Sequence, residues 1–171
     1  MSEGKLPVDI GIGLNTDMVV SGNIGSKKRM DYTMIGDGVN LASRLESACK
    51  QYGAHILISE YTYKKLRGTY RTRDIDLVVV KGKTQPVGVY EILDYHTEET
   101  YPHLIDAMGY FRDGLNKYRS KAFGPARELF EKVLSLNPND KTAKLYVERC
   151  DTLTATPLPD DWCGVWVMEE K

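Results

Sequence analysis

An amide and a guanidinium group stand four residues apart in this chain, at Asn40 and Arg44. In a helix, residues at this spacing share one face, so both side chains would project together from adjacent turns. An amide can hydrogen-bond a sugar oxygen, and a guanidinium can bind a phosphate through a fork of N–H donors. The pair therefore has the chemistry to hold a sugar beside a phosphate.

A helix over residues 37–51 is predicted to position this pair. Asp37, between two glycines, is a candidate N-cap, and Gly53 is a candidate left-handed cap at the other end. Apolar residues recur at the spacing of one helix face, at Leu41, Leu45 and Ala48. For these residues alone, an ordinary amphipathic helix with an exposed arginine stays an open interpretation.

Extended segments surround this helix along the chain. Residues 8–16 alternate around glycines and predict a strand whose small face meets a neighbour closely. A turn at Asp17 and a strand over residues 18–24 then predict a β-hairpin. The basic tip at residues 26–29 is interpreted as a solvated turn, with a phosphate-attracting loop as the alternative.

The remaining pattern completes the expected fold. Further strands are expected at residues 30–35, 56–58, 72–80 and 87–93, and a short helix from Ser59 and Glu60 to about Leu66. This order predicts an α+β fold with helices packed on a mainly antiparallel sheet.

Three segments together resemble the catalytic domain of the class III nucleotidyl cyclases, the adenylate and guanylate cyclases. Residues 32–46 are similar to the signature of this family, residues 10–16 and 20–25 to its paired central strands, and Lys81-Gly82-Lys83 to its late lysine turn. The resemblance implies that residues 7–94 form the C-terminal part of such a domain, related to the ferredoxin-like folds.

The resemblance also implies a reaction, the conversion of ATP to 3′,5′-cyclic AMP and pyrophosphate by a phosphorus–oxygen lyase. Asn40 would orient the ribose, and Arg44 would stabilise the charge that builds on the phosphate. Thr33 occupies the place of a purine-reading residue and favours ATP over GTP. Lys81 would reach the terminal phosphates, with Lys83 as the second choice.

Class III cyclases bind two metal ions, Mg²⁺ or Mn²⁺, through two aspartates in segments that precede those seen here. Asp37 belongs to the helix entry, so no metal ligand of the family is expected in this chain. The family's sites form at a head-to-tail dimer interface. We therefore expect the chain to be inactive alone, and to need a homodimer or a full-length cyclase subunit to complete a site.

The composition changes after the cyclase-like part. Residues 94–102 are polar, and residues 103–153 follow a helical pattern that resembles one tetratricopeptide repeat, although Lys121 stands where the repeat usually has glycine. A single repeat cannot bury its own apolar face, so it should pack on the cyclase-like part or on a partner. The tail, residues 154–171, carries Trp162 and Trp166, which predicts docking in a groove. A non-catalytic protein-interaction module is the alternative function.

Composition argues against several other classes of protein. The 171 residues have a formal net charge of −1, so no general nucleic-acid surface is expected. No apolar run approaches the ~20 residues of a membrane span, and the first residues do not resemble a signal peptide. Cys49, Cys150 and Cys163 form no metal-binding pattern and are expected to be free thiols in the cytoplasm.

Overall fold

The computed structural model describes residues 9–26, 29–79 and 85–167. For Trp166 and Val167 it describes the backbone alone. Two segments singled out in the sequence therefore lie outside the described residues: Lys27 and Lys28 of the basic tip, and the Lys81-Gly82-Lys83 turn. The elements, in chain order, are β1 (Ile12–Leu14), β2 (Val20–Ser26), β3 (Arg29–Ile35), α1 (Asp37–Tyr52), β4 (Ile56–Ser59), α2 (Glu60–Tyr63), β5 (Thr72–Val79), β6 (Pro86–Ile92), α3 (Leu104–Arg119), α4 (Phe123–Leu136), α5 (Lys141–Thr154) and β7 (Val165–Val167).

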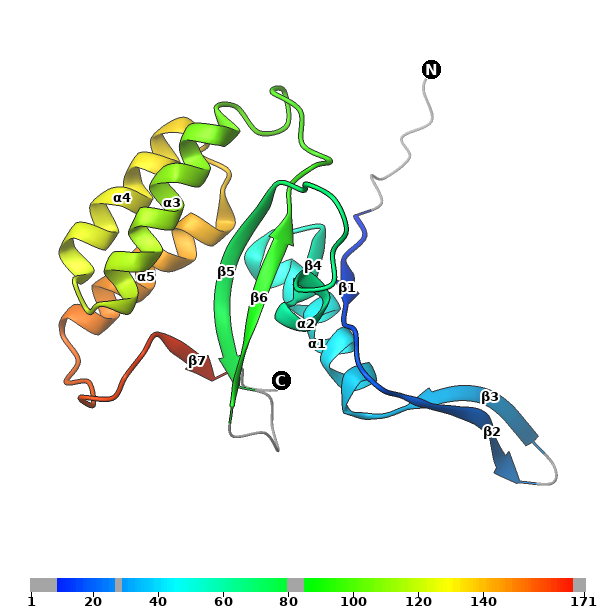
Figure 1. Cartoon of the computed structure of the whole chain (residues 1–171). Coiled ribbons are helices and arrows are strands. Elements are labelled where there is room, and N and C mark those ends of the chain that lie inside the picture. Colours follow the sequence, from blue (N-terminus) through cyan, green and yellow to red (C-terminus); the bar gives the residue numbers. More distant parts are fainter. Residues whose placement is uncertain (1–8, 27–28, 80–84, 168–171) are drawn as a thin grey trace, which may run out of the picture.

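A five-stranded sheet in the order β1-β4-β6-β5-β7 forms the centre of the molecule, and β2 and β3 form a separate two-stranded sheet (Figure 1). The β4–β6 and β5–β6 pairs are antiparallel, whereas β1–β4 and β5–β7 are parallel. The predicted α+β class, with helices packed on a sheet, is confirmed, and the sheet is mixed.

The predicted hairpin between residues 8–16 and 18–24 is wrong. β1 pairs in parallel with β4, with Ile12 opposite Ile56, and β2 pairs with β3 instead. The glycines of β1 explain its position, because a Cβ at Gly13 would lie 2.2 Å from the carbonyl oxygen of Ala42. β1 is therefore pressed against α1, and the chain after it leads away to the β2–β3 hairpin.

α1 forms as predicted, with its apolar stripe in the core, but its start differs. The N-cap is Gly36, with φ 152° and no side-chain hydrogen bond, so Asp37 is the first helical residue and not the cap. Glycine adopts this φ readily, whereas other residues rarely do. At the other end Gly53 is the left-handed cap that the sequence predicts, with φ 68°. The short helix α2 has the expected Ser59 cap and ends at Tyr63, earlier than predicted.

The three C-terminal helices pack against one another, and two of them, α3 and α5, also contact β5 or α1 of the cyclase-like part (Figure 1). Trp162 of the tail packs on Tyr118 and Phe123, as expected for a docked tail. Lys121, between α3 and α4, has φ 61°, in the left-handed region that favours glycine. The tetratricopeptide resemblance and the domain boundaries stay predictions.

Helices long and apolar enough to cross a membrane do not occur within the described ranges.

Candidate functional site

The first turn of α1 is tied to the ends of two strands. Asn15, directly after β1, donates a hydrogen bond from Nδ2 to the carbonyl oxygen of Gly38, over 3.0 Å. Ser59, buried at the end of β4, donates from its hydroxyl to Oδ1 of Asn15, over 2.6 Å. The position of the helix start is therefore set by β1 and β4. The sequence reasoning missed Asn15, although a polar amide directly after an apolar strand was a signal that could have identified it.

Gly38 is a glycine for a steric reason. A Cβ at this position would lie 2.5 Å from the Cβ of Asp17, and Gly38 is buried. Asp17 is held in place because its Oδ1 accepts a hydrogen bond from the backbone N–H of Met18, over 2.8 Å. The glycine-rich entry thus lets the chain after β1 pass close against the first turn of α1.

Asn40 and Arg44 lie one turn apart on α1, as their spacing predicts. The side chain of Asn40 is exposed, and that of Arg44 is half-buried. The neighbouring Leu41 and Leu45 are buried and anchor this part of the helix in the core. The structure therefore brings an amide and a guanidinium together on a helix whose start is fixed, an arrangement suited to holding two parts of one ligand.

Thr33 lies on a different element. It is in β3, exposed and opposite Gly22 of β2. The β2–β3 hairpin extends away from the central sheet, whereas α1 packs against it (Figure 1). The structure thus places Thr33 before Gly36 on the hairpin and the Asn40–Arg44 pair after it on the helix. Lys81 lies outside the described residues.

The hairpin and its approach expose much apolar surface. Side chains of alternate residues point to opposite faces of a two-stranded ribbon, and directly paired residues share a face. By the register of the pair, one face carries the exposed side chains of Val20, Ile24 and Ile35, and the other carries those of Met30, Tyr32 and Met34. Met18 and Val19, which precede β2, are exposed as well. Exposed apolar patches of this kind mark surfaces that contact other molecules.

The described residues do not fit a metal centre. Across residues 9–26, 29–79 and 85–167, no three His, Cys, Asp or Glu side chains are grouped so that they could hold an ion. Asp37 is the first residue of α1.

Comparison with known proteins identifies a family. The family described as the adenylate and guanylate cyclase catalytic domain matches residues 1–101. An adenylate cyclase of Dictyostelium discoideum, terminal-differentiation specific, is 35% identical over 147 residues, which are 84% of this chain and 7% of that protein. An adenylate cyclase of Anabaena cylindrica is 44% identical over 98 residues, 54% of this chain and 20% of that protein.

Among solved structures, the adenylyl cyclase CyaB from P. aeruginosa is 42% identical with a TM-score of 0.45, and the match covers 54% of this chain and 46% of that one. The chain thus spans less than half the length of each of these relatives.

Proposed function

The chain belongs to the adenylate and guanylate cyclase catalytic-domain family, and from this premise we propose that it supplies Asn40 and Arg44 to an adenylate cyclase site. The observation that carries the proposal is the placement of this amide and this guanidinium one turn apart on α1. Asn15 holds the first turn of this helix by a hydrogen bond to Gly38, so the backbone that carries both side chains is fixed.

In the proposed reaction the ribose 3′ oxygen of ATP attacks the α-phosphorus. The 3′ hydroxyl loses its proton to solvent water, a bond forms between the oxygen and the α-phosphorus, and the bond to the leaving pyrophosphate breaks. Asn40 orients the ribose by hydrogen bonding. Arg44 donates to the phosphate oxygens, where negative charge increases in the transition state. The described residues do not fit the family's metal ions.

ATP is the proposed substrate for two reasons. The Thr33 hydroxyl can accept a hydrogen bond from the amino group of adenine, and the relatives from Dictyostelium and Anabaena are both named adenylate cyclases. Lys81 is proposed to bind the terminal phosphates, as its resemblance to the family lysine implies.

We further propose that a second cyclase chain covers the exposed hairpin and supplies the metal ligands. The support is the apolar surface of β2 and β3, which includes Tyr32 and Met34, 72% and 58% exposed. The partner would be a second copy of this chain or a full-length cyclase subunit. A second copy would bring the same residues, so the full-length subunit is the partner expected to restore activity.

The test measures cyclic AMP formed from Mn-ATP by the full chain, alone and mixed with a full-length class III subunit whose own Asn/Arg pair is disabled. We expect no product from the chain alone and product from the mixture. Arg44→Ala should abolish this rescue, whereas Arg112→Ala, at an exposed site on α3, should leave it unchanged. Absence of rescue by a folded chain would contradict the proposal and favour the non-catalytic interaction module.

A further inference from the structure

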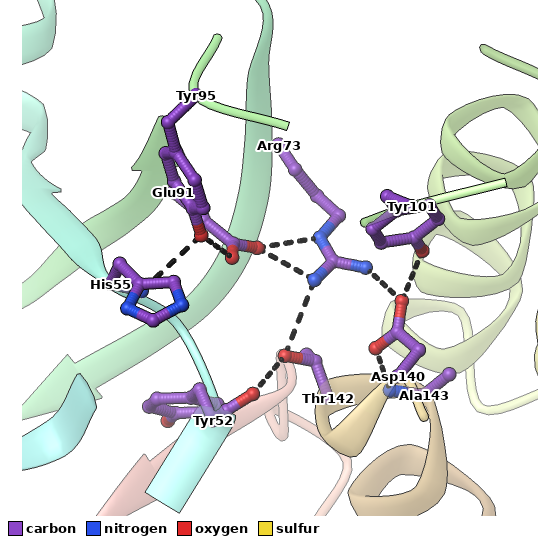
Figure 2. Close-up of polar contacts among 9 residues, drawn as sticks. All are labelled: Tyr52, His55, Arg73, Glu91, Tyr95, Tyr101, Asp140, Thr142 and Ala143. Atoms are coloured by element: carbon purple, nitrogen blue, oxygen red, sulfur yellow. Dashed lines mark hydrogen bonds and ion pairs between the residues drawn. The ribbon is translucent and has the colours of Figure 1, made fainter. Parts of the chain in front are cut away.

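The C-terminal end of α1 rests on the first turn of α5, ninety residues further along the chain (Figure 2). The Thr142 hydroxyl donates a hydrogen bond over 2.9 Å to the carbonyl oxygen of Tyr52, the last residue of α1. Both residues are fully buried. The last carbonyl groups of a helix have no partner within the helix, so Thr142 satisfies a group that burial would otherwise leave unpaired.

A second contact fixes the same end of α1. The Tyr52 hydroxyl donates over 2.6 Å to Oδ2 of Asp76 in β5, and Nη1 of Arg149 in α5 lies 2.7 Å from the same oxygen. Burial is the main cause that raises the pKa of Tyr52 well above its usual range, and the Asp76 carboxylate raises it further. The hydroxyl therefore keeps the proton that it donates. Backbone and side chain of Tyr52 are therefore both held, one by α5 directly and one through Asp76.

Thr142 is itself held by a buried ionic network (Figure 2). Nη2 of Arg73 lies 3.5 Å from the Thr142 hydroxyl oxygen, which can accept from it while donating to Tyr52. The Arg73 guanidinium is paired with Glu91 of β6 over 2.6 Å and with Asp140, the N-cap of α5, over 2.5 Å. Oδ1 of Asp140 accepts from the backbone N–H of Ala143 and thereby fixes the first turn of α5.

α1 is held at its far end as well as at its first turn, which Asn15 fixes. Along β1, the two backbones lie so close that a Cβ at Gly13 would be 2.2 Å from the carbonyl oxygen of Ala42. At the far end, the Lys141 side chain lies so close to Gly53 that a Cβ there would be 2.7 Å from the Lys141 Cδ. Displacement of α1 along its axis is therefore opposed by α5.

Arg44 is eight residues from Tyr52 on the same helix, a separation of about 12 Å along its axis. A packed helix moves as a stiff element, so a shift at Tyr52 moves Arg44 with it. Because Arg44 would act on charge that develops in the transition state, a displacement of about 1 Å could lower the rate by a large factor.

We propose that Thr142 of α5 is a positioning residue for Asn40 and Arg44, an inference that rests on the function proposed above. Through this residue, the C-terminal helices hold the functional helix of the cyclase-like part at its far end. The C-terminal helices would then contribute to the geometry of the site.

The test compares three full-length variants in the same mixture with the disabled cyclase subunit. Thr142→Val removes the hydroxyl at nearly constant volume, and Thr142→Ser restores it. Thr152→Val is the matched control, because its hydroxyl donates to the Glu148 carbonyl within α5 and the residue is exposed. We expect Thr142→Val to lower kcat about tenfold with KM for ATP changed less than about twofold. Thr142→Ser and Thr152→Val should stay within about twofold of the unmodified chain.

A second measurement separates failure of this inference from failure of the proposed function. Amide hydrogen exchange in the chain alone should become about tenfold faster at residues 40–44 in Thr142→Val, relative to residues 126–133 of α4 in the same sample. Absence of rescue by the unmodified chain overturns the proposed function, and exchange then decides whether Thr142 positions α1. An unchanged kcat in Thr142→Val where the unmodified chain gives rescue overturns the inference. An exchange effect confined to residues 51–53, or an equal effect in Thr152→Val, also overturns it.

Discussion

Arg73 of β5 and Asp140 of α5, 67 positions apart in the chain, form a buried ion pair with Nη1 and Oδ2 2.5 Å apart. Their side chains are 6% and 1% exposed. The Tyr101 hydroxyl donates to the same Asp140 oxygen, and the Arg73 guanidinium lies over the Phe111 ring of α3. One arginine thus links the sheet to two of the C-terminal helices.

Replacement of Arg73 by methionine should strongly destabilise the fold. The change removes the cation from between Glu91 and Asp140 and leaves two buried carboxylates without it. We expect the free energy of unfolding to fall by about 3–5 kcal/mol, the range for a buried pair that loses one partner. Urea unfolding of the purified chain measures this difference.

The matched control is Arg112→Met. Arg112 pairs with Asp113 on the exposed side of α3, with side chains 75% and 56% exposed. Exposed pairs contribute about 0–1 kcal/mol, so this variant should be nearly neutral. Equal losses in the two variants would show that the buried network adds no special stability.

Stability should decrease as the pH falls through the range in which histidine titrates. The pKa of His96 is lowered, mainly because the ring is partly buried. The nearby charges of His55, Arg73 and Arg71 lower this pKa further, and Asp140 opposes them in part. The unfolded chain, with a histidine pKa of about 6.5, then binds the proton more readily than the folded chain. The contribution of His96 is complete above about pH 6.5 and is lost as the pH falls toward the lower pKa of the folded state.

His96→Gln tests this expectation, because glutamine does not titrate and can still bond the Thr100 hydroxyl that His96 contacts. Urea unfolding at intervals between about pH 5 and 7.5 should show a smaller decrease for the variant than for the unmodified chain. Parallel curves for the two proteins would assign the pH dependence to other groups.

The helix α1 could be predicted because its signals are local. Leu41, Leu45 and Ala48 repeat at helical spacing, and Gly53 ends the pattern, so no distant residue is needed to recognise the element. The pairing of β1 could not be predicted in this way. Its partner, β4, begins 44 residues after the start of β1, and register depends on contacts that sequence periodicity does not contain.

The buried network was missed for a related reason. Charged residues such as Arg73, Asp76 and Asp140 are usually exposed, so their burial follows from packing and not from pattern. A register irregularity between Asp74 and Asp76 also breaks the alternation of β5, which buries Ile75 and Asp76 in succession. Among the candidate site residues, Asn40 and Arg44 could be placed together from spacing alone, whereas Asn15 reaches α1 only through the fold.

Gly13→Ala should displace α1 from β1. The added Cβ would lie 2.2 Å from the Ala42 carbonyl oxygen and 2.3 Å from the Glu46 nitrogen, and both are backbone atoms that cannot rotate away. We expect a loss of about 1–3 kcal/mol in the free energy of unfolding, as for an overpacked core. Gly109→Ala, within α3, is the control, because its added Cβ would meet no described atom within 4 Å beyond its chain neighbours and the helix's own backbone, and alanine favours a helix. Thermal unfolding measures the stability of both variants. A Gly13→Ala variant as stable as the unmodified chain would contradict this prediction.

Tyr32→Lys should weaken association with a second cyclase chain. Tyr32 lies on β3 and is 72% exposed within the apolar surface of the hairpin. If that surface is buried against a partner, loss of the aromatic ring and burial of a charge should raise the Kd about tenfold or more. Ile105→Lys, at a residue of α3 that is 69% exposed, makes a similar surface change away from the hairpin and should have no effect. Sedimentation velocity over a concentration series measures both. An unchanged Kd in Tyr32→Lys would show that the partner does not cover this face of the hairpin.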